Sequence, residues 1–167
     1  MNTRVGFSTT KAWISRLIRF FTGAAVSHAW LLYFDVEFGR EMVLEATLEG
    51  VRIIPLDVFK KQNLVVKIAL PRKDLTMGLL KAGELLGARY DFFGLFGMLW
   101  VLIGHWLKRK WQNPWNNPRA MFCSEFVAQV LKWSDYPSTD YWDPANMSPE
   151  DLYTFIVKDE THAALSQ

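Results

Sequence analysis

The stretch SHAWLLYFDVEFGREMVLEAT, residues 27–47, decides the fold of this 167-residue chain. Its first part, residues 27–34, is apolar on both alternating faces, which is typical of a strand in the middle of a sheet. A polar segment that contains Gly39 separates it from residues 41–47, a second extended and mostly apolar run. Two such runs around a short glycine-containing turn predict a β-hairpin.

Two polar side chains interrupt this hairpin, His28 in the first strand and Glu45 in the second. Neither is cheap to bury alone. If the hairpin closes around residues 36–39, a register whose paired numbers add up to 73 places His28 opposite Glu45, and one of 75 makes them diagonal neighbours on one face. An even sum separates them onto opposite faces. A buried His–Glu pair with a purely structural role is the alternative to a functional one.

The rest of the chain predicts an α+β fold, a small antiparallel sheet or partial barrel packed against helices. Half of the residues are hydrophobic (50%), enough for one core, so we expect one domain over residues 1–158 and a flexible tail over 159–167. Apolar spacing, capping residues and β-branched content place the other elements. These are strands at 5–9, 50–56 and 63–70, and helices at 10–23, at 74–86, after Phe122 and from Ser148.

Charge and cysteine content exclude several function classes. The 19 Lys and Arg and 17 Asp and Glu residues are dispersed and give a net charge of +2, which does not favour nucleic-acid binding. A single cysteine excludes an intramolecular disulfide framework, and no Cys/His spacing resembles a zinc site, so neither a metal nor another cofactor is expected. Arginines interrupt the apolar residues near the N-terminus, which does not resemble a signal peptide, and a cytoplasmic location is expected.

One apolar segment, residues 92–107, carries no Asp, Glu, Lys or Arg. It is shorter than the ~20 residues that a membrane-spanning helix needs, so we expect a buried helix, an interfacial segment or the wall of an acyl-chain pocket. The basic run at 108–110 follows between two tryptophans, Trp106 and Trp111. Residues 92–111 therefore predict either a peripheral membrane contact or a basic face exposed to solvent. If they contact a membrane, the whole chain could be a non-catalytic module that binds a membrane surface.

The only cysteine, Cys123, begins the helix that follows Phe122. It shares the apolar face of that helix, so a buried, inert cysteine is the simplest interpretation. A helix N-terminus also favours a thiolate. A neutral imidazole beside the thiol would take its proton, and a carboxylate on the other ring nitrogen would fix the tautomer. Cys123, His28 and Glu45 together would account for all three unusual positions.

The order of these motifs resembles the circularly permuted papain-fold cysteine hydrolases related to the NlpC peptidases, in particular their YiiX/YebB-like branch. The similarity extends over most of the chain. It rests on Ser27-His28 at a strand start, Glu45 before Gly50-Val51, then Tyr90-Asp91, and finally Phe122-Cys123-Ser124-Glu125-Phe126.

The resemblance implies a nucleophile at Cys123, a base at His28 and an orienting acid at Glu45. The implied reaction is hydrolysis of an amide or ester bond through a thioester, on a small-molecule substrate, a cell-wall peptide or a lipid-like compound. The related lecithin:retinol acyltransferases share the permuted order and make acyl transfer the alternative, although they carry an Asn-Cys-Glu-His-like motif at the nucleophile. The Cys123 backbone N–H is the first candidate for an oxyanion donor, and Ser27 and Tyr33 are candidates for the second.

Overall fold

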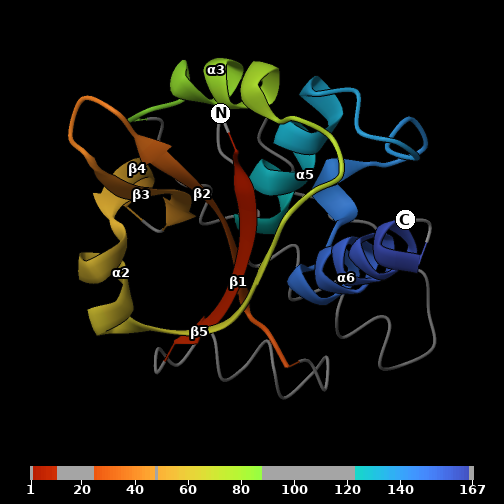
Figure 1. The fold of residues 1–167 in the computed structure, drawn as a ribbon, viewed down its shortest axis with the longest axis horizontal. Coiled ribbons are helices and arrows are strands. Elements are labelled where there is room, and N and C mark those ends of the chain that lie inside the picture. Colours follow the sequence, from red (N-terminus) through yellow and green to blue (C-terminus); the bar gives the residue numbers. More distant parts are fainter. Residues whose placement is uncertain (1, 11–24, 48, 88–122, 166–167) are drawn as a thin grey trace.

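The computed structural model describes residues 2–10, 25–47, 49–87 and 123–165, and in this part of the chain the fold is α+β. It contains five strands, four α-helices and one short 3-10 helix (Figure 1). The elements in chain order are β1 (Arg4–Thr10), β2 (His28–Asp35), β3 (Arg40–Thr47), β4 (Gly50–Pro55), α2 (Leu56–Gln62), β5 (Asn63–Ala69), α3 (Thr76–Gly83), α5 (Cys123–Trp133), η1 (Pro144–Asn146) and α6 (Pro149–Leu165).

The strands form one antiparallel sheet in the order β4-β3-β2-β1-β5. The predicted hairpin is confirmed, because β2 pairs with β3 from Leu31↔Leu44 to Asp35↔Arg40. This is the register of sum 75, which makes His28 and Glu45 diagonal neighbours. Pro55 ends β4 at the edge of the sheet, where a residue without an N–H is tolerated.

Helix α2, which the sequence analysis did not predict, covers the inner face of the sheet. It leads from β4 to β5, the two edge strands (Figure 1). Phe59 of α2 packs against Trp30, with ring centroids 4.6 Å apart. Gly6, opposite Trp30 on β1, makes room for this indole, because a Cβ there would lie 2.4 Å from the ring. Sheet and helix thus enclose a small buried cluster of Trp30, Leu32, Val43, Leu56 and Phe59.

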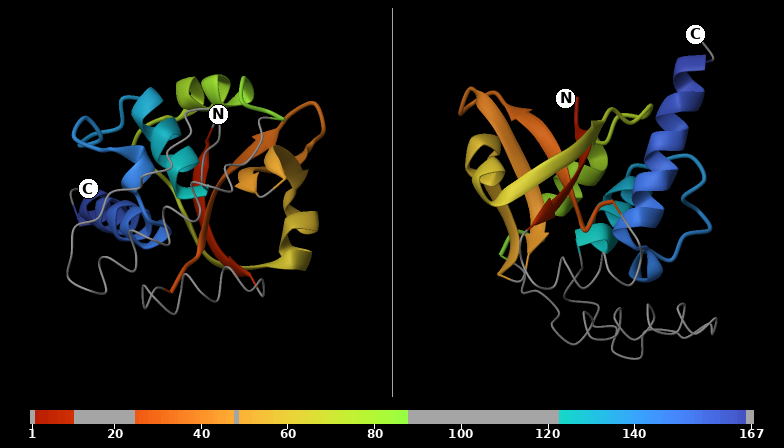
Figure 2. Two further views of the ribbon diagram at one scale, coloured as in Figure 1. Left: turned by 180° about the vertical axis from the view of Figure 1, so that it is seen from behind. Right: turned by 90° about the horizontal axis from the view of Figure 1, so that it is seen from below.

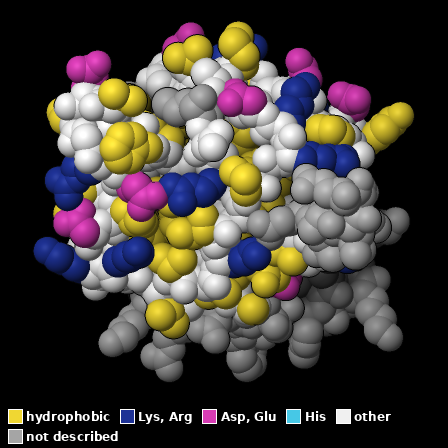
Figure 3. All heavy atoms as spheres, in the orientation of Figure 1, with side chains coloured by type: hydrophobic (Ala, Val, Ile, Leu, Met, Phe, Trp, Pro, Cys, Tyr) yellow, Lys and Arg dark blue, Asp and Glu magenta, His cyan; other side chains and the backbone are white. Residues whose placement is uncertain are grey.

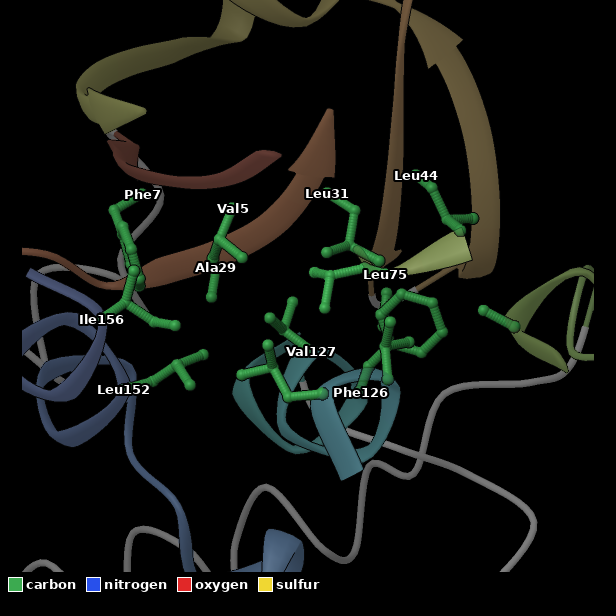
Figure 4. Close-up of a cluster of buried hydrophobic side chains, with 14 of the residues drawn as sticks. Val5, Phe7, Ala29, Leu31, Leu44, Leu75, Phe126, Val127, Leu152 and Ile156 are labelled. Carbon is green, nitrogen blue, oxygen red and sulfur yellow. The ribbon is translucent and has the colours of Figure 1, made fainter. Parts of the chain in front are cut away.

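The larger core lies on the other side of the sheet, where α5 and α6 pack (Figure 2). Phe126 and Val127 of α5 point toward β2, as Figure 4 shows, and Leu152 and Ile156 of α6 join them. The predicted apolar face of α5 is confirmed for its later members, since Phe126, Val127, Val130 and Leu131 are all fully buried.

Helix α3 is shorter than the predicted 74–86, because it ends at Gly83. It contacts α5 through small side chains. A Cβ at Gly78 would lie 2.2 Å from the backbone oxygen of Val130 and 2.4 Å from Ser134 Oγ, and the Gly78 N–H donates to that hydroxyl at 3.0 Å. The two helices therefore approach closely enough to exclude any side chain at position 78.

This close approach predicts that Gly78→Ala destabilises the fold. We expect a loss of about 2–3 kcal/mol in the free energy of unfolding, because a backbone atom of α5 must move to admit the methyl group. Gly83→Ala is the matched control, since a Cβ there meets nothing within 4 Å; it should be neutral or stabilising by up to about 1 kcal/mol. Urea unfolding of both variants measures the difference, and equal stabilities would contradict the packing.

Helix α6 starts as predicted, with Ser148 as its cap: the Asp151 N–H donates to Ser148 Oγ at 3.1 Å. Helix α6 continues past residue 158, after which the sequence predicts a tail, and reaches Leu165. The carboxylate of Asp159 pairs with Arg72 at 3.0 Å and accepts a hydrogen bond from the Tyr136 hydroxyl, which attaches this part of the helix to the rest of the fold.

The outer surface mixes charges of both signs. On the face drawn in Figure 3, lysine and arginine side chains lie interspersed with acidic and hydrophobic ones. Among the described residues, no helix is both long enough and apolar enough to cross a membrane. The predicted helix at 10–23 and the apolar segment 92–107, with its basic neighbour at 108–110, lie outside the described residues.

Candidate functional site

The hairpin brings His28 and Glu45 together at the end where its two strands part. The β2–β3 ladder begins at Leu31↔Leu44, so the start of β2 and the end of β3 extend beyond it. There His28 Nε2 lies 2.6 Å from Glu45 Oε2. Glu45 is almost fully buried, with 2% of its side chain exposed, and His28 exposes 13%. The two side chains share the face that α2 covers, and the Phe59 ring stacks on His28 with centroids 6.2 Å apart.

Helix α5 brings the thiol to the other side of the imidazole. Cys123 is the first residue of the helix, which packs against β2. The His28 side chain and the backbone N–H groups of Ala29 and Ser124 hydrogen-bond its sulfur. Because Nε2 of His28 faces Glu45, Nδ1 is the ring nitrogen that serves the thiol. The structure thus joins all three predicted site residues in one hydrogen-bonded series.

Cys123 differs from the other members of the apolar face in that it is partly exposed. A cysteine whose only role is packing would be expected to be buried. Its position at the first residue of α5 also puts it next to the positive end of the helix dipole. Exposure, a hydrogen-bonded imidazole and a helix N-terminus are the surroundings of reactive cysteines.

The pKa values of the thiol and the imidazole move toward an ion pair. Burial raises the pKa of Cys123, but the positive charge and hydrogen bond of His28, with the N–H groups of Ala29 and Ser124, outweigh it and lower this pKa. Burial lowers the pKa of His28, but the Cys123 thiolate and the hydrogen bonds to Cys123 and Glu45 raise it to about 10. Both shifts favour the ion pair, a thiolate beside an imidazolium, over the neutral thiol and imidazole.

Glu45 stays ionised in the same way. Burial raises its pKa, but the hydrogen bond and charge of His28, together with Arg52, lower it below the usual range of a carboxyl group. The carboxylate therefore stabilises the imidazolium and holds the ring with Nδ1 toward the sulfur.

Arg52 is the site residue that the sequence analysis missed. It lies on β4, directly opposite Glu45 in the β3–β4 register. Its Nε donates to Glu45 Oε1 at 3.0 Å, and its Nη2 lies 2.9 Å from the same oxygen. The sequence alone does not give the register between β3 and β4. Without that register, the alternation of residues 50–56 does not show that Arg52 lies on the same face as Glu45.

The two side chains proposed as second oxyanion donors lie in different places. Tyr33 pairs with Met42 near the turn of the hairpin, five positions from His28 along β2, and it is not beside the thiol. Ser27 precedes β2, and its backbone N–H donates to the Ser8 carbonyl at 3.1 Å. Ser124 is buried, and its hydroxyl donates to the Met147 carbonyl at 2.6 Å, which anchors the first turn of α5. Tyr90 and Asp91 lie outside the described residues.

A thiol, an imidazole and a buried carboxylate in this order are the set of groups that covalent catalysis at a carbonyl uses. Within residues 2–10, 25–47, 49–87 and 123–165, no group of three or more His, Cys, Asp or Glu side chains is placed to hold a metal ion. Comparison of the chain with protein-family models and with curated proteins finds no match, so the geometry of the site is what bears on its function.

Proposed function

We propose that this protein is a cysteine-dependent hydrolase that cleaves an amide or ester bond through a Cys123–His28–Glu45 triad. The observation that carries the proposal is the single series from the thiol through the imidazole to the buried carboxylate. A structural His–Glu pair does not require a partly exposed cysteine on the free side of the ring. A buried structural cysteine does not require an imidazolium beside it.

The same arrangement supports a permuted papain-like fold of the NlpC type. The base and the acid come from an antiparallel sheet early in the chain, and the nucleophile comes from the start of a later helix packed against that sheet. This is the order that the sequence resemblance implies. Helix α2 connects the two edge strands and covers one face of the sheet, and this supports the proposal of a partial barrel.

The first half of the reaction forms a thioester. The Cys123 thiolate attacks the carbonyl carbon of the substrate, and the carbonyl oxygen takes up the negative charge. The backbone N–H of Cys123, in the first turn of α5, is the candidate donor to that oxygen, because N–H groups of a first turn have no partner within the helix. His28 then gives its proton to the leaving amine or alcohol, the carbon–nitrogen or carbon–oxygen bond breaks, and the acyl group remains on sulfur.

The second half releases the acyl group. His28, now neutral, takes a proton from a water molecule as that water attacks the thioester carbonyl. The carbon–sulfur bond breaks, the acid leaves and the thiolate–imidazolium pair is restored. Glu45 stays ionised throughout, and its role is to orient and stabilise the imidazolium. An alcohol or amine in place of water would give acyl transfer.

The acyl-enzyme is the most direct test. We expect a short-chain p-nitrophenyl ester to give a burst of p-nitrophenol equal to the protein concentration, and mass spectrometry to find one acyl group on Cys123. Cys123→Ala should show neither, and His28→Ala should suppress both. Acylation at other residues, or an unchanged burst in Cys123→Ala, would sink the proposal. Adding an amine or alcohol acceptor and identifying the products separates hydrolysis from transfer.

A further inference from the structure

The buried carboxylate of Glu45 is shared between two cations. Its Oε2 lies 2.6 Å from His28 Nε2, while its Oε1 accepts from Arg52 Nε at 3.0 Å and lies 2.9 Å from Nη2. With both oxygens engaged on opposite sides, the carboxylate group cannot rotate without losing one partner. Two nitrogens of one rigid guanidinium lie within 3.0 Å of the same oxygen, which favours one position of the Arg52 side chain.

Arg52 reaches this position because the strands β3 and β4 pair it directly with Glu45. Its third contact is with Glu49, whose Oε2 accepts from Nη1 at 2.8 Å. Glu49 is exposed (79%), Arg52 is partly exposed (33%), and Glu45 is buried (2%). Four groups of alternating charge thus run from the partly exposed Arg52 to the sulfur, namely Arg52, Glu45, His28 and Cys123, and the exposed Glu49 touches only the outer end of this series.

The imidazole alone would leave one end of the carboxylate unsatisfied. Without Arg52, the Oε1 atom of a side chain that is 2% exposed has no other hydrogen bond from the described residues, and an ionised oxygen without a partner is costly to bury. In the part of the chain that the structure describes, Phe59 of α2 stacks on His28, and Cys123 of α5 also contacts His28. Arg52 is the cation that these described residues place against the outer oxygen of Glu45.

We propose that Arg52 is a positioning residue of the catalytic centre: it holds the Glu45 carboxylate ionised and aligned on His28, and through His28 it maintains the thiolate of Cys123. This inference rests on the proposed function and adds a fourth residue to it. An ionised Glu45 can accept hydrogen bonds from both His28 and Arg52, one on each oxygen. An amide side chain at position 45 would present an NH2 group to one of them.

The test compares Arg52→Gln and Arg52→Met with the charge-retaining Arg52→Lys and with Glu49→Gln as the matched control. The first readout is the rate of Cys123 alkylation by iodoacetamide as a function of pH, which requires no substrate. The second is the pH profile of p-nitrophenyl ester hydrolysis. An NMR titration of the His28 ring supplies an independent measurement.

The expected shift has a definite sign. Loss of Arg52 makes Glu45 easier to protonate, so on acidification His28 loses the negative charge beside it at a higher pH. The acid limb of alkylation, which is the pH range over which the alkylation rate rises, therefore moves to higher pH. At alkaline pH the carboxylate no longer shares its charge with Arg52 and holds the His28 proton more firmly, so the alkaline limb of hydrolysis also moves up. Hydrolysis near neutral pH should fall about tenfold.

The control variants separate charge from shape. Arg52→Lys should keep both limbs near their wild-type positions with a several-fold lower rate, because a lysine keeps the charge without the fork. Glu49→Gln should resemble the wild type. Unmoved limbs in both Arg52→Gln and Arg52→Met overturn the inference even if the rate falls, because a general loss of structure lowers rates without moving limbs. If the wild type hydrolyses no ester, the proposed function fails separately, and the alkylation profile still decides the role of Arg52.

Discussion

Replacing His28 with alanine is expected to slow hydrolysis by about a thousandfold, because the variant loses both the general base and the charge that stabilises the thiolate. The clearest measurement is the pH dependence of iodoacetamide alkylation. In the wild type the imidazolium lowers the pKa of Cys123, so the thiol should react well below pH ~8. In His28→Ala only burial and the two backbone N–H groups remain, and the acid limb should move to higher pH.

The size of the alkylation effect follows from the thiolate fraction. An ordinary thiol is about 1% ionised at pH ~6.5, whereas an acidified one is largely ionised. The more basic thiolate of the variant is intrinsically more nucleophilic, which offsets part of the loss, so we expect a decrease of about tenfold or more. His162→Ala, which removes another of the three histidines of the chain, serves as the control. An acid limb that does not move in His28→Ala would show that the imidazole does not acidify the thiol.

The wild-type profile should have a second feature. His28 has its pKa raised to about 10, so hydrolysis should fall as the pH rises through about 10, where the proton for the leaving group is lost. Alkylation should not fall there, since the thiolate persists. If hydrolysis falls at alkaline pH and alkylation does not, the group that titrates there is the proton donor to the leaving group, as expected for His28.

The second large effect is expected at Glu45. Glu45→Ala leaves the His28 ring without its acceptor and Arg52 without its main partner, and hydrolysis should fall by about a thousandfold. Glu45→Gln should lose about a hundredfold: it keeps the shape, but its amide nitrogen must face one of two donors. A stability loss of about 2–3 kcal/mol should accompany the alanine variant, less than for a fully buried pair because Arg52 reaches water.

Steady-state kinetics and urea unfolding measure these changes, with Glu49→Gln as a control because it alters the exposed neighbour of Arg52 only. Activity in Glu45→Ala within a few-fold of the wild type would contradict the role of the carboxylate. A fall in stability with unchanged activity would assign Glu45 to the architecture alone.

The sequence was sufficient to predict the hairpin and its two unusual polar residues, because the period-two pattern and the glycine turn are local signals. It left the register open, and the register decides whether His28 and Glu45 share a face. The position of Cys123 at the first residue of α5 was likewise visible from the apolar spacing of the helix. Its approach to His28 was not, since it depends on how α5 packs against β2.

Two features could not be predicted for related reasons. Helix α2 is seven residues long and buries only Leu56 and Phe59, too few to show a period. Arg52 lies in a run that is apolar apart from itself, and an arginine on a strand usually faces solvent. Only the pairing of β3 with β4 reveals that it meets a buried carboxylate. Helix α3 was predicted from its leucines, whereas its buried residues are Gly78, which contacts α5, and Ala82, and both have little hydrophobic signal.

The groups of the proposed site divide unequally along the chain. His28, Glu45 and Arg52 fall within one meander of three consecutive strands, β2 to β4, so short-range folding suffices to assemble them. The sulfur arrives from far downstream, and its acidity exists only while α5 is docked on β2. Any partly folded form that keeps the meander but releases this helix would carry an ordinary thiol. The acidity of the thiol therefore depends on a long-range contact, and a molecule in which α5 is not docked on β2 would not be activated for acylation.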